Sequence, residues 1–187
     1  MGKTTLAKQL MARFDTFEVS ISHTTRSPRG KEVDGVDYHF ITDAEFDRMV
    51  ERGEFAEWAN VHAHRYGTSL ATIERLQANG RDIMLDIDYQ GVEQLSKAYD
   101  DAVTVLLTPP SMEELERRLR GRETDSEAQI QIRMAKARDE LAHYSVFRYV
   151  VINRNLEDAM ANLEAIFLAE RRRIERNRDF LNTLVST

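Results

Sequence analysis

The chain of 187 residues contains no cysteine, only three prolines and a single tryptophan. The lack of cysteine excludes disulfide bonds and thiolate metal sites, and it fits a reducing compartment such as the cytoplasm. No apolar run approaches the roughly 18 residues that cross a bilayer, and no basic segment followed by an apolar one marks a secretion signal. The net charge of −6 argues against a general nucleic-acid-binding protein, whose surface is usually basic. We therefore expect a cytoplasmic globular protein of one domain, with neither nucleic acid nor membrane as partner.

Short apolar segments alternate with helical patterns along most of the chain. Four short apolar segments with little polar alternation have the pattern of strands covered on both faces of a parallel sheet: residues 17–21, 83–87, 103–107 and 149–152. Helical spacing of apolar residues is found over 4–14, 69–79, 90–99, 111–120, 126–142 and 156–178. The alternation predicts an α/β fold with a parallel sheet flanked by helices. Residues 24–68 break it and predict an inserted subdomain.

The front of the first helix, Gly2-Lys3-Thr4, has the form of the second half of a phosphate-binding loop, G-x-x-x-x-G-K-[ST]. In such a loop the helix N-terminus holds phosphates, Lys3 bridges the β- and γ-phosphates, and the Thr4 hydroxyl binds Mg²⁺. Only Met1 precedes the second glycine of the motif. By itself this short match fits an ordinary charged helix start equally well.

Two carboxylates, Asp86 and Asp88, follow an apolar strand-like segment. Open α/β sheets bind ligands at the carboxyl ends of their strands, where carboxylates suit a hydrated Mg²⁺ or an arginine that must be oriented. A strand-ending aspartate can also start a turn or cap the next helix, so both interpretations stay open.

Residues 22–32 carry Arg26 and Arg29 on either side of Pro28. Two arginines three residues apart can clamp one phosphate, because each guanidinium offers bidentate hydrogen bonds. An exposed basic loop is the alternative for any two of these residues.

The chain closely resembles the guanylate kinase family. The matching segments, which occur in the family's order across essentially the whole chain, are 20–29, 32–40, 57–59, 66–69, 86–91, 109–111, 118–122 and 124–127. The resemblance implies a P-loop NTPase-type fold and Mg²⁺-dependent transfer of the γ-phosphoryl group from ATP to GMP. It also implies a core (1–23, 69–121 and 136–187), a GMP-binding subdomain (about 24–68) and a helical lid (about 122–135).

The resemblance assigns roles on the GMP side. Glu57 would accept hydrogen bonds from guanine N1–H and the exocyclic amine, while Ser22 and Thr68 would hydrogen-bond the base. The residues implied to hold the phosphate are Arg26, Arg29, Tyr38 and Tyr66, and the GMP site would also include Glu32 and Asp88.

The resemblance also assigns roles on the ATP side. The implied ATP-binding residues are Gly2, Lys3, Thr4, Thr5, Arg122, Arg133 and Asn153, with Thr4 as the Mg²⁺ ligand. The implied catalytic residues are Lys3, Arg26, Arg122, Arg133 and Asp86. No general base is required, since the GMP phosphate is already largely dianionic near neutral pH.

The family places an interior strand before the phosphate loop, and loss of such a strand exposes two strand edges. We therefore expect that Met1 is not the natural start or that an upstream segment was lost. Two alternatives to an active kinase follow: a non-catalytic binding module of the same fold, and a truncated form that binds GMP but is inactive with ATP. The presence of Lys3, Arg26 and Glu57 opposes the module, which needs none of them.

Overall fold

The computed structural model describes residues 2–61, 63–121 and 126–186, and the chain divides into two compact units. Unit 1 consists of Met1–Leu10, Val103–Ala142 and Phe147–Thr187, and unit 2 of Met11–Ala102 and His143–Val146. The first helix, α1 (Lys3–Arg13), begins in unit 1 and ends in unit 2. No helix within the described residues is long and apolar enough to cross a membrane.

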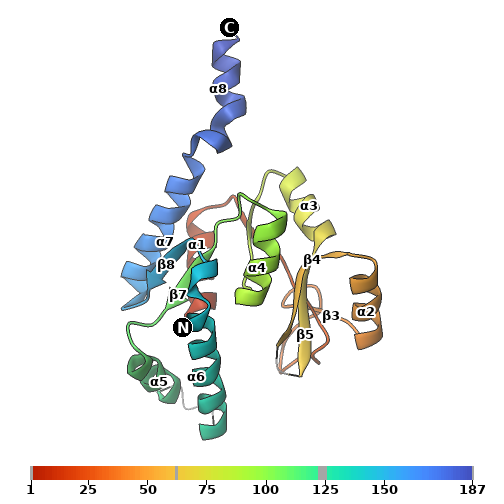
Figure 1. The fold of residues 1–187 in the computed structure, drawn as a ribbon, viewed down its shortest axis with the longest axis vertical. Helices are drawn as coiled ribbons and strands as arrows, with labels where there is room; N and C mark the ends of the chain where they lie inside the picture. Colours follow the sequence, from red (N-terminus) through yellow and green to blue (C-terminus); the bar gives the residue numbers. More distant parts are fainter. Residues whose placement is uncertain (1, 62, 122–125, 187) are drawn as a thin grey trace. The chain divides into compact units, whose positions relative to one another are not determined.

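Unit 1 contains two parallel strands, β7 (Val105–Thr108) and β8 (Tyr149–Ile152), which pair along their whole length (Figure 1). The backbone N–H of Asn153 continues the ladder by donating to the carbonyl of Thr108 at 2.8 Å. Their parallel pairing confirms the prediction drawn from two apolar, β-branched segments with little polar alternation.

Two helices of unit 1, α5 (Met112–Arg120) and α6 (Glu127–Ala142), pack through their apolar faces. The buried cluster between them comprises Leu115, Leu119, Ile130, Met134 and Ala137, with Met112 packed against it. Helix α5 starts at Ser111, whose hydroxyl accepts from the N–H of Glu114 at 3.2 Å and so caps the helix.

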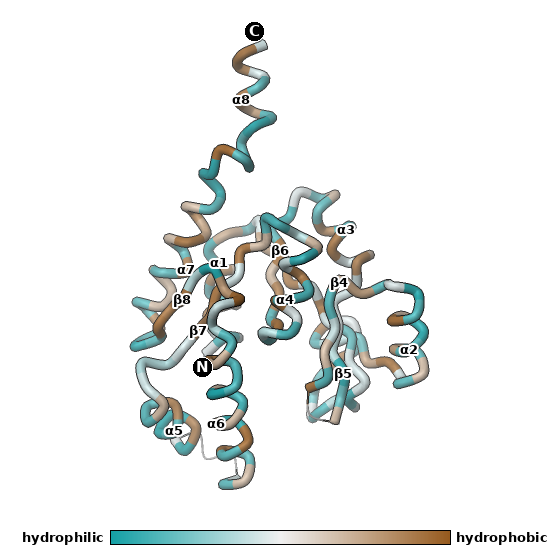
Figure 2. The backbone as a smooth tube through the Cα atoms, viewed as in Figure 1, coloured by the Kyte–Doolittle hydropathy of each residue, from teal (hydrophilic) through white to brown (hydrophobic). Residues whose placement is uncertain are grey.

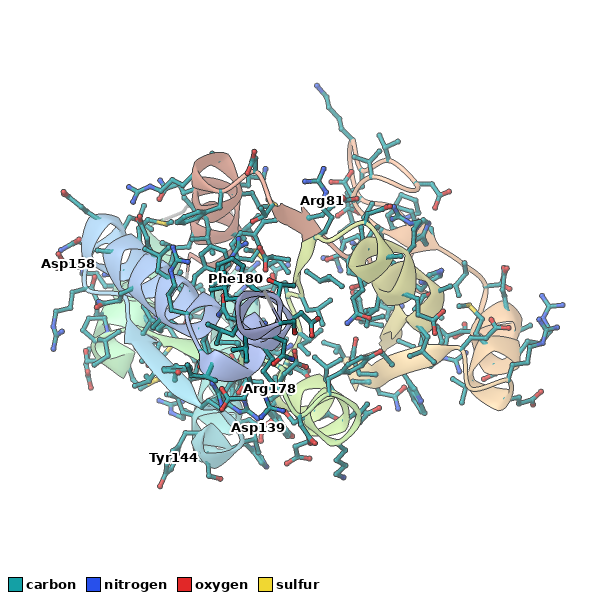
Figure 3. The ribbon with its side chains drawn as sticks, turned by 90° about the horizontal axis from the view of Figure 1, so that it is seen from above. Arg81, Asp139, Tyr144, Asp158, Arg178 and Phe180 are labelled. Atoms are coloured by element: carbon teal, nitrogen blue, oxygen red, sulfur yellow. The ribbon has the colours of Figure 1, made fainter. Side chains whose placement is uncertain are left out.

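The C-terminal part of unit 1 contains α7 (Leu156–Arg171), a 3₁₀ turn (Ile174–Asn177) and α8 (Arg178–Val185). Figure 1 shows α8 extending beyond the end of α7, and Figure 2 shows hydrophobic residues among hydrophilic ones along it. Phe180 of this helix, labelled in Figure 3, is 63% exposed. The predicted continuous helix 156–178 is wrong at its end. Ile174 is 64% exposed, so no packed apolar side chain there holds the chain in a helix, and propensity alone is a weak constraint.

Unit 2 contains a parallel pair of strands, β1 (Phe17–Val19) and β6 (Asp82–Met84). The N–H of Ser20 extends the pairing by donating to the carbonyl of Met84 at 3.1 Å. Arg81, labelled in Figure 3, precedes β6 and donates to the backbone carbonyl of Asp15 at 2.8 Å.

A second sheet of unit 2 has the strand order β3-β2-β5-β4. Its strands are β2 (His23–Thr24), β3 (His39–Phe40), β4 (Phe55–Val61) and β5 (His64–Ser69). The β2–β3 pair is parallel, whereas β5 runs antiparallel to both β2 and β4. Strand β4 forms one edge of this sheet.

Three helices of unit 2 begin at a side-chain cap. They are α2 (Asp43–Glu51), α3 (Leu70–Ala78) and α4 (Tyr89–Ala98), and their caps are Thr42, Ser69 and Asp88. Helix α2 was not predicted from the sequence, although Thr42 and Glu45 have the spacing of a capping box. Phe46 of this helix is fully buried, and its ring centroid lies 4.6 Å from that of Phe55.

Candidate active site

Glu57, on β4, carries a buried carboxylate and is only 4% exposed. The hydroxyl of Thr68, on the neighbouring strand β5, donates to Glu57 Oε1 at 2.5 Å. Burial raises the pKa of Glu57, the Thr68 hydrogen bond opposes this, and the charge of Asp88 raises the pKa further. A carboxylate accepts up to about four hydrogen bonds, so Glu57 retains capacity for the donors of a ligand.

Arg26 is 6% exposed and forms a bidentate pair with Glu32. Its two terminal nitrogens donate to the two carboxylate oxygens at 2.8 and 2.9 Å, and its Nε donates to the Tyr66 hydroxyl at 3.3 Å. The hydrogen bond with Glu32 raises the pKa of Arg26 and lowers that of Glu32. The pair with Glu32 therefore holds the charged guanidinium of Arg26 in one orientation, as recognition of an anion by two parallel hydrogen bonds requires.

Tyr38 lies beside the same guanidinium. The Cζ of Arg26 is 5.2 Å from the Tyr38 ring centroid, and the rings of Tyr38 and Tyr66 are 5.9 Å apart in an edge arrangement. Arg29 is exposed, and its backbone N–H donates to Glu32 Oε2 at 2.7 Å. The structure thus brings together Arg26, Tyr38 and Tyr66, and it places the backbone of Arg29 against the same Glu32 carboxylate.

Ser22 and the two aspartates occupy connecting segments of unit 2. Ser22 is half-buried just before β2, and its carbonyl accepts from the N–H of His39 at 2.9 Å. The predicted strand 83–87 is too long, because β6 ends at Met84 and leaves Asp86 exposed. Asp88 caps α4, since its Oδ1 accepts from the backbone N–H of Gln90 at 3.1 Å.

On the ATP side, Gly2 adopts a φ of +84°, in the region that favours glycine. A Cβ at this position would lie 3.0 Å from the side-chain nitrogen of Asn153. Asn153 is 3% exposed, so a larger residue in place of Gly2 would press on a buried side chain. Thr4 and Thr5 follow, exposed, on the first turn of α1.

Lys3 forms an ion pair with Glu140 of α6, with 2.8 Å between Nζ and Oε1. Glu140 is 4% exposed, whereas the Lys3 side chain is 32% exposed. Arg133 lies exposed on the same helix. Arg122, the other predicted lid arginine, lies outside the described residues.

Arg118 of α5 fixes the backbone around Asn153. Its terminal nitrogens donate to the carbonyls of Asn153 at 2.9 Å and of Arg154 at 2.8 Å. Helix α5 therefore holds the segment that follows β8, where the sequence placed an adenine-side contact.

The two groups of predicted residues fall into different units. The described ATP-side residues, all in unit 1, are Gly2, Lys3, Thr4, Thr5, Arg133 and Asn153. The GMP-side residues, all in unit 2, are Ser22, Arg26, Arg29, Glu32, Tyr38, Glu57, Tyr66, Thr68 and Asp88.

Comparison with known proteins identifies the family. The guanylate kinase family model matches residues 1–170. The chain belongs to the guanylate kinase family.

Individual relatives agree. A guanylate kinase of Paramagnetospirillum magneticum is 47% identical over 176 residues, which cover 94% of this chain and 82% of the relative. One of Legionella pneumophila is 47% identical over 175 residues, covering 94% of this chain and 84% of the relative. The crystal structure of a guanylate kinase from Anaplasma phagocytophilum matches with a TM-score of 0.78 and 30% identity over 96% of this chain and 89% of that one.

These matches confirm the predicted family, the α/β fold of P-loop NTPase type and the enzyme class, an ATP:GMP phosphotransferase. The relatives named guanylate kinase, 47% identical over 94% of this chain, favour the enzyme over the non-catalytic module.

Two residues of this guanylate kinase that contact the proposed site or its neighbours, Glu140 and Gln94, were not predicted from the sequence. Glu140 could have been found, because it continues the helical spacing of buried Ile130, Met134 and Ala137, and a charge on a buried face needs a partner. Gln94 could not, because a glutamine on a helix beside a sheet has no sequence signal of its own.

Proposed function

We propose that this guanylate kinase binds GMP through residues of unit 2 and ATP with Mg²⁺ through residues of unit 1. The buried carboxylate of Glu57, held through one oxygen by Thr68, is the observation that carries the proposal. It suits a base that offers two adjacent donors, and guanine does so with N1–H and its exocyclic amine.

Selectivity against adenine follows from the same carboxylate. Adenine presents an acceptor at N1, which would face the acceptor oxygens of Glu57 and leave both unpaired. A site built to hydrogen-bond a donor rejects analogues that lack it by large factors. Ser22 and Thr68 complete the proposed contacts with the base.

The GMP phosphate is proposed to bind Arg26, Arg29, Tyr38 and Tyr66. The carboxylate of Glu32 now pairs with both terminal nitrogens of Arg26, so the phosphate has to share or replace that anion. A guanidinium has five N–H donors, and Arg26 can therefore keep one contact to Glu32 while it binds phosphate.

On the ATP side, we propose that the first turn of α1 and Lys3 bind the phosphates, since helix N-termini carry N–H groups without intrahelical partners. The exposed Thr4 hydroxyl fits Mg²⁺, a hard cation that prefers oxygen ligands and keeps several waters. When bound with ATP, Mg²⁺ neutralises charge on the phosphates. Arg122 and Arg133 would contact the donor phosphates, and Asn153 the adenine.

The chemical step needs positioning and charge neutralisation by the chain's own cations rather than a base. Lys3 and the arginines would stabilise the charge of the transferring group, and Asp86 and Asp88 would orient groups between the nucleotides. Closure of the predicted lid and GMP-binding subdomain would exclude water, which otherwise hydrolyses ATP. We propose the cytoplasm as the site of action, in keeping with the lack of cysteine.

The test is a coupled assay of ADP formation with GMP, AMP or no acceptor. Glu57→Gln is expected to raise the KM for GMP at least about tenfold, since hydrogen bonds to a charged group contribute roughly 1.5–3 kcal/mol. Lys3→Met is expected to lower kcat about a hundredfold or more and leave GMP binding unchanged. Wild-type activity that is equal with GMP and AMP would refute the proposal, as would GMP binding that withstands the loss of the Glu57 charge.

A further inference from the structure

Gln94 of α4 makes two hydrogen bonds to the backbone of Trp58, the residue next to Glu57. Its Oε1 accepts from the Trp58 N–H at 3.2 Å, and its Nε2 donates to the Trp58 carbonyl at 2.7 Å. Nε2 also donates to the carbonyl of Gln90, one turn earlier in α4, at 3.2 Å. Since β4 is an edge strand, the amide of Gln94 pairs with its backbone as a neighbouring strand would.

Gly91, one turn before Gln94, faces the Glu57 carboxylate itself. A Cβ built on Gly91 would lie 2.5 Å from Glu57 Oε2 and 3.1 Å from its Cδ. Gly91 is buried in the first turn of α4, so a side chain there could not turn away into solvent. The absence of a side chain is what lets the helix approach the carboxylate.

These contacts constrain both oxygens of Glu57. Thr68 holds Oε1 from β5, Gly91 limits the position of Oε2 from α4, and Gln94 fixes the adjacent peptide group. Two parallel hydrogen bonds to a base require both oxygens at the same time, and a small shift of the carboxylate weakens at least one of them.

We propose that Gln94 and Gly91 are positioning residues that set the Glu57 carboxylate for guanine and so determine base selectivity. The inference rests on the proposed role of Glu57. Neither residue needs to touch the nucleotide, because both act through the strand and the carboxylate that α4 contacts.

The first test is Gln94→Met, which keeps the length of the side chain and removes both polar atoms. The readout is the ratio of kcat/KM for GMP to that for IMP, which lacks the exocyclic amine and offers Glu57 only one donor. The ratio is expected to fall about fivefold or more, because a shifted carboxylate weakens its hydrogen bond to the exocyclic amine by about 1 kcal/mol. The KM for ATP is expected to stay unchanged. Gln77→Met, at an exposed position of α3, is the matched control.

The second test is Gly91→Ala. Alanine is a better helix former than glycine, whereas a methyl group this close to Glu57 Oε2 costs packing energy, so the thermal midpoint is measured beside the kinetics. The new methyl group is expected to displace Glu57 Oε2 and lower the GMP-to-IMP ratio in a protein that still folds. A folded Gly91→Ala protein with lowered selectivity therefore separates positioning from stability.

Glu57→Gln distinguishes failure of this inference from failure of the proposed site. If Glu57→Gln leaves the GMP-to-IMP ratio intact, the role of Glu57 is wrong and the positioning role falls with it. The other outcome is that Glu57→Gln abolishes the preference while Gln94→Met and Gly91→Ala keep the ratio within about twofold of wild type. In that case only the positioning role is overturned, because a change of about twofold is less than one hydrogen bond contributes.

Discussion

The ammonium group of Lys3 lies 2.8 Å from Oε1 of Glu140, a carboxylate on the buried face of α6. The two residues are 137 positions apart in the chain and belong to the same unit. A phosphate that binds Lys3 must compete with this fixed anion, so Glu140 sets both the location of the lysine and the cost of moving it.

Removal of the Glu140 charge is expected to tighten ATP binding. Glu140→Gln keeps an oxygen acceptor for Lys3 but removes the charge. The interaction with Lys3 is expected to weaken by about 1 kcal/mol, the upper range for partly exposed ion pairs. This free energy corresponds to about a fivefold lower KM for ATP. The free energy of unfolding is expected to fall by a similar amount, about 1 kcal/mol, in urea titrations. Glu157→Gln, exposed on α7, is the kinetic control, and a raised KM for ATP in Glu140→Gln would contradict the competition.

The geometry of Arg26 is expected to matter more than its charge. Arg26→Lys keeps the positive charge but loses the fork that pairs with both oxygens of Glu32 and Nε that contacts Tyr66. We expect the KM for GMP to rise about tenfold, or about 1.4 kcal/mol, with the KM for ATP unchanged. Steady-state kinetics beside Arg48→Lys, exposed on α2, measures this, and equal KM values for GMP in the two variants would rule it out.

Glu57 is expected to lower stability increasingly as the pH rises. Its pKa in the folded protein is raised above the ordinary value of a glutamate, so the folded state binds the proton more tightly than the unfolded state. Stability therefore falls as the pH rises through the folded pKa, because the buried carboxyl then ionises. Glu57→Gln, neutral at every pH, is expected to be the more stable protein near pH 8, with the difference vanishing towards pH 4. Urea midpoints across this range give the answer, and a difference independent of pH would count against it.

His23 is expected to make the protein sensitive to acid. Burial, with a further effect from the charge of His39, lowers the pKa of His23 from 6.5 to about 4, and Asp34 and Glu54 oppose the shift. Its Nδ1 is buried with no hydrogen-bond partner among the described residues, and its ring centroid lies 4.7 Å from that of His39. The stability due to neutral His23 is complete above pH 6.5 and is lost as the pH falls towards 4.

The test replaces His23 by phenylalanine, which keeps a ring beside Phe55 and does not titrate. Between pH 6.5 and 4, His23→Phe is expected to lose about 1–2 kcal/mol less stability than wild type, because solvent screens part of the effect at a half-buried histidine. Parallel stability curves for the two proteins would show that His23 does not contribute to acid sensitivity.

Most elements of the fold could be predicted from sequence because their signals are local. The spacing of apolar residues placed α3, α4, α5 and α6 to within a few residues. The strands at 103–107 and 149–152 were located from their β-branched runs and found paired as β7 and β8. The predictions failed at α2, which was not expected, at the strand 83–87, which ends at Met84, and at the end of the final helix, where apolar spacing continues without a surface to pack against.

Within the proposed site, sequence alone predicted side chains that lie together in one short segment. Arg26, Arg29 and Glu32 lie within seven residues of each other, and a loop of this composition brings them together whatever surrounds it. The Gly2-Lys3-Thr4 motif is likewise local in sequence, and the structure adds that Gly2 is left-handed.

Tertiary structure alone decided the contacts that hold these groups in place. Lys3 meets Glu140, Thr68 meets Glu57, and Gln94 meets Trp58 only because helices and strands pack in one register. The reason is physical: a side chain's own type fixes what it can bond, whereas burial and packing fix which of many possible partners it reaches. The residue types of this guanylate kinase thus determine which hydrogen bonds and ion pairs its side chains can form. Contacts between distant parts of the chain determine which of these form and how the side chains are oriented.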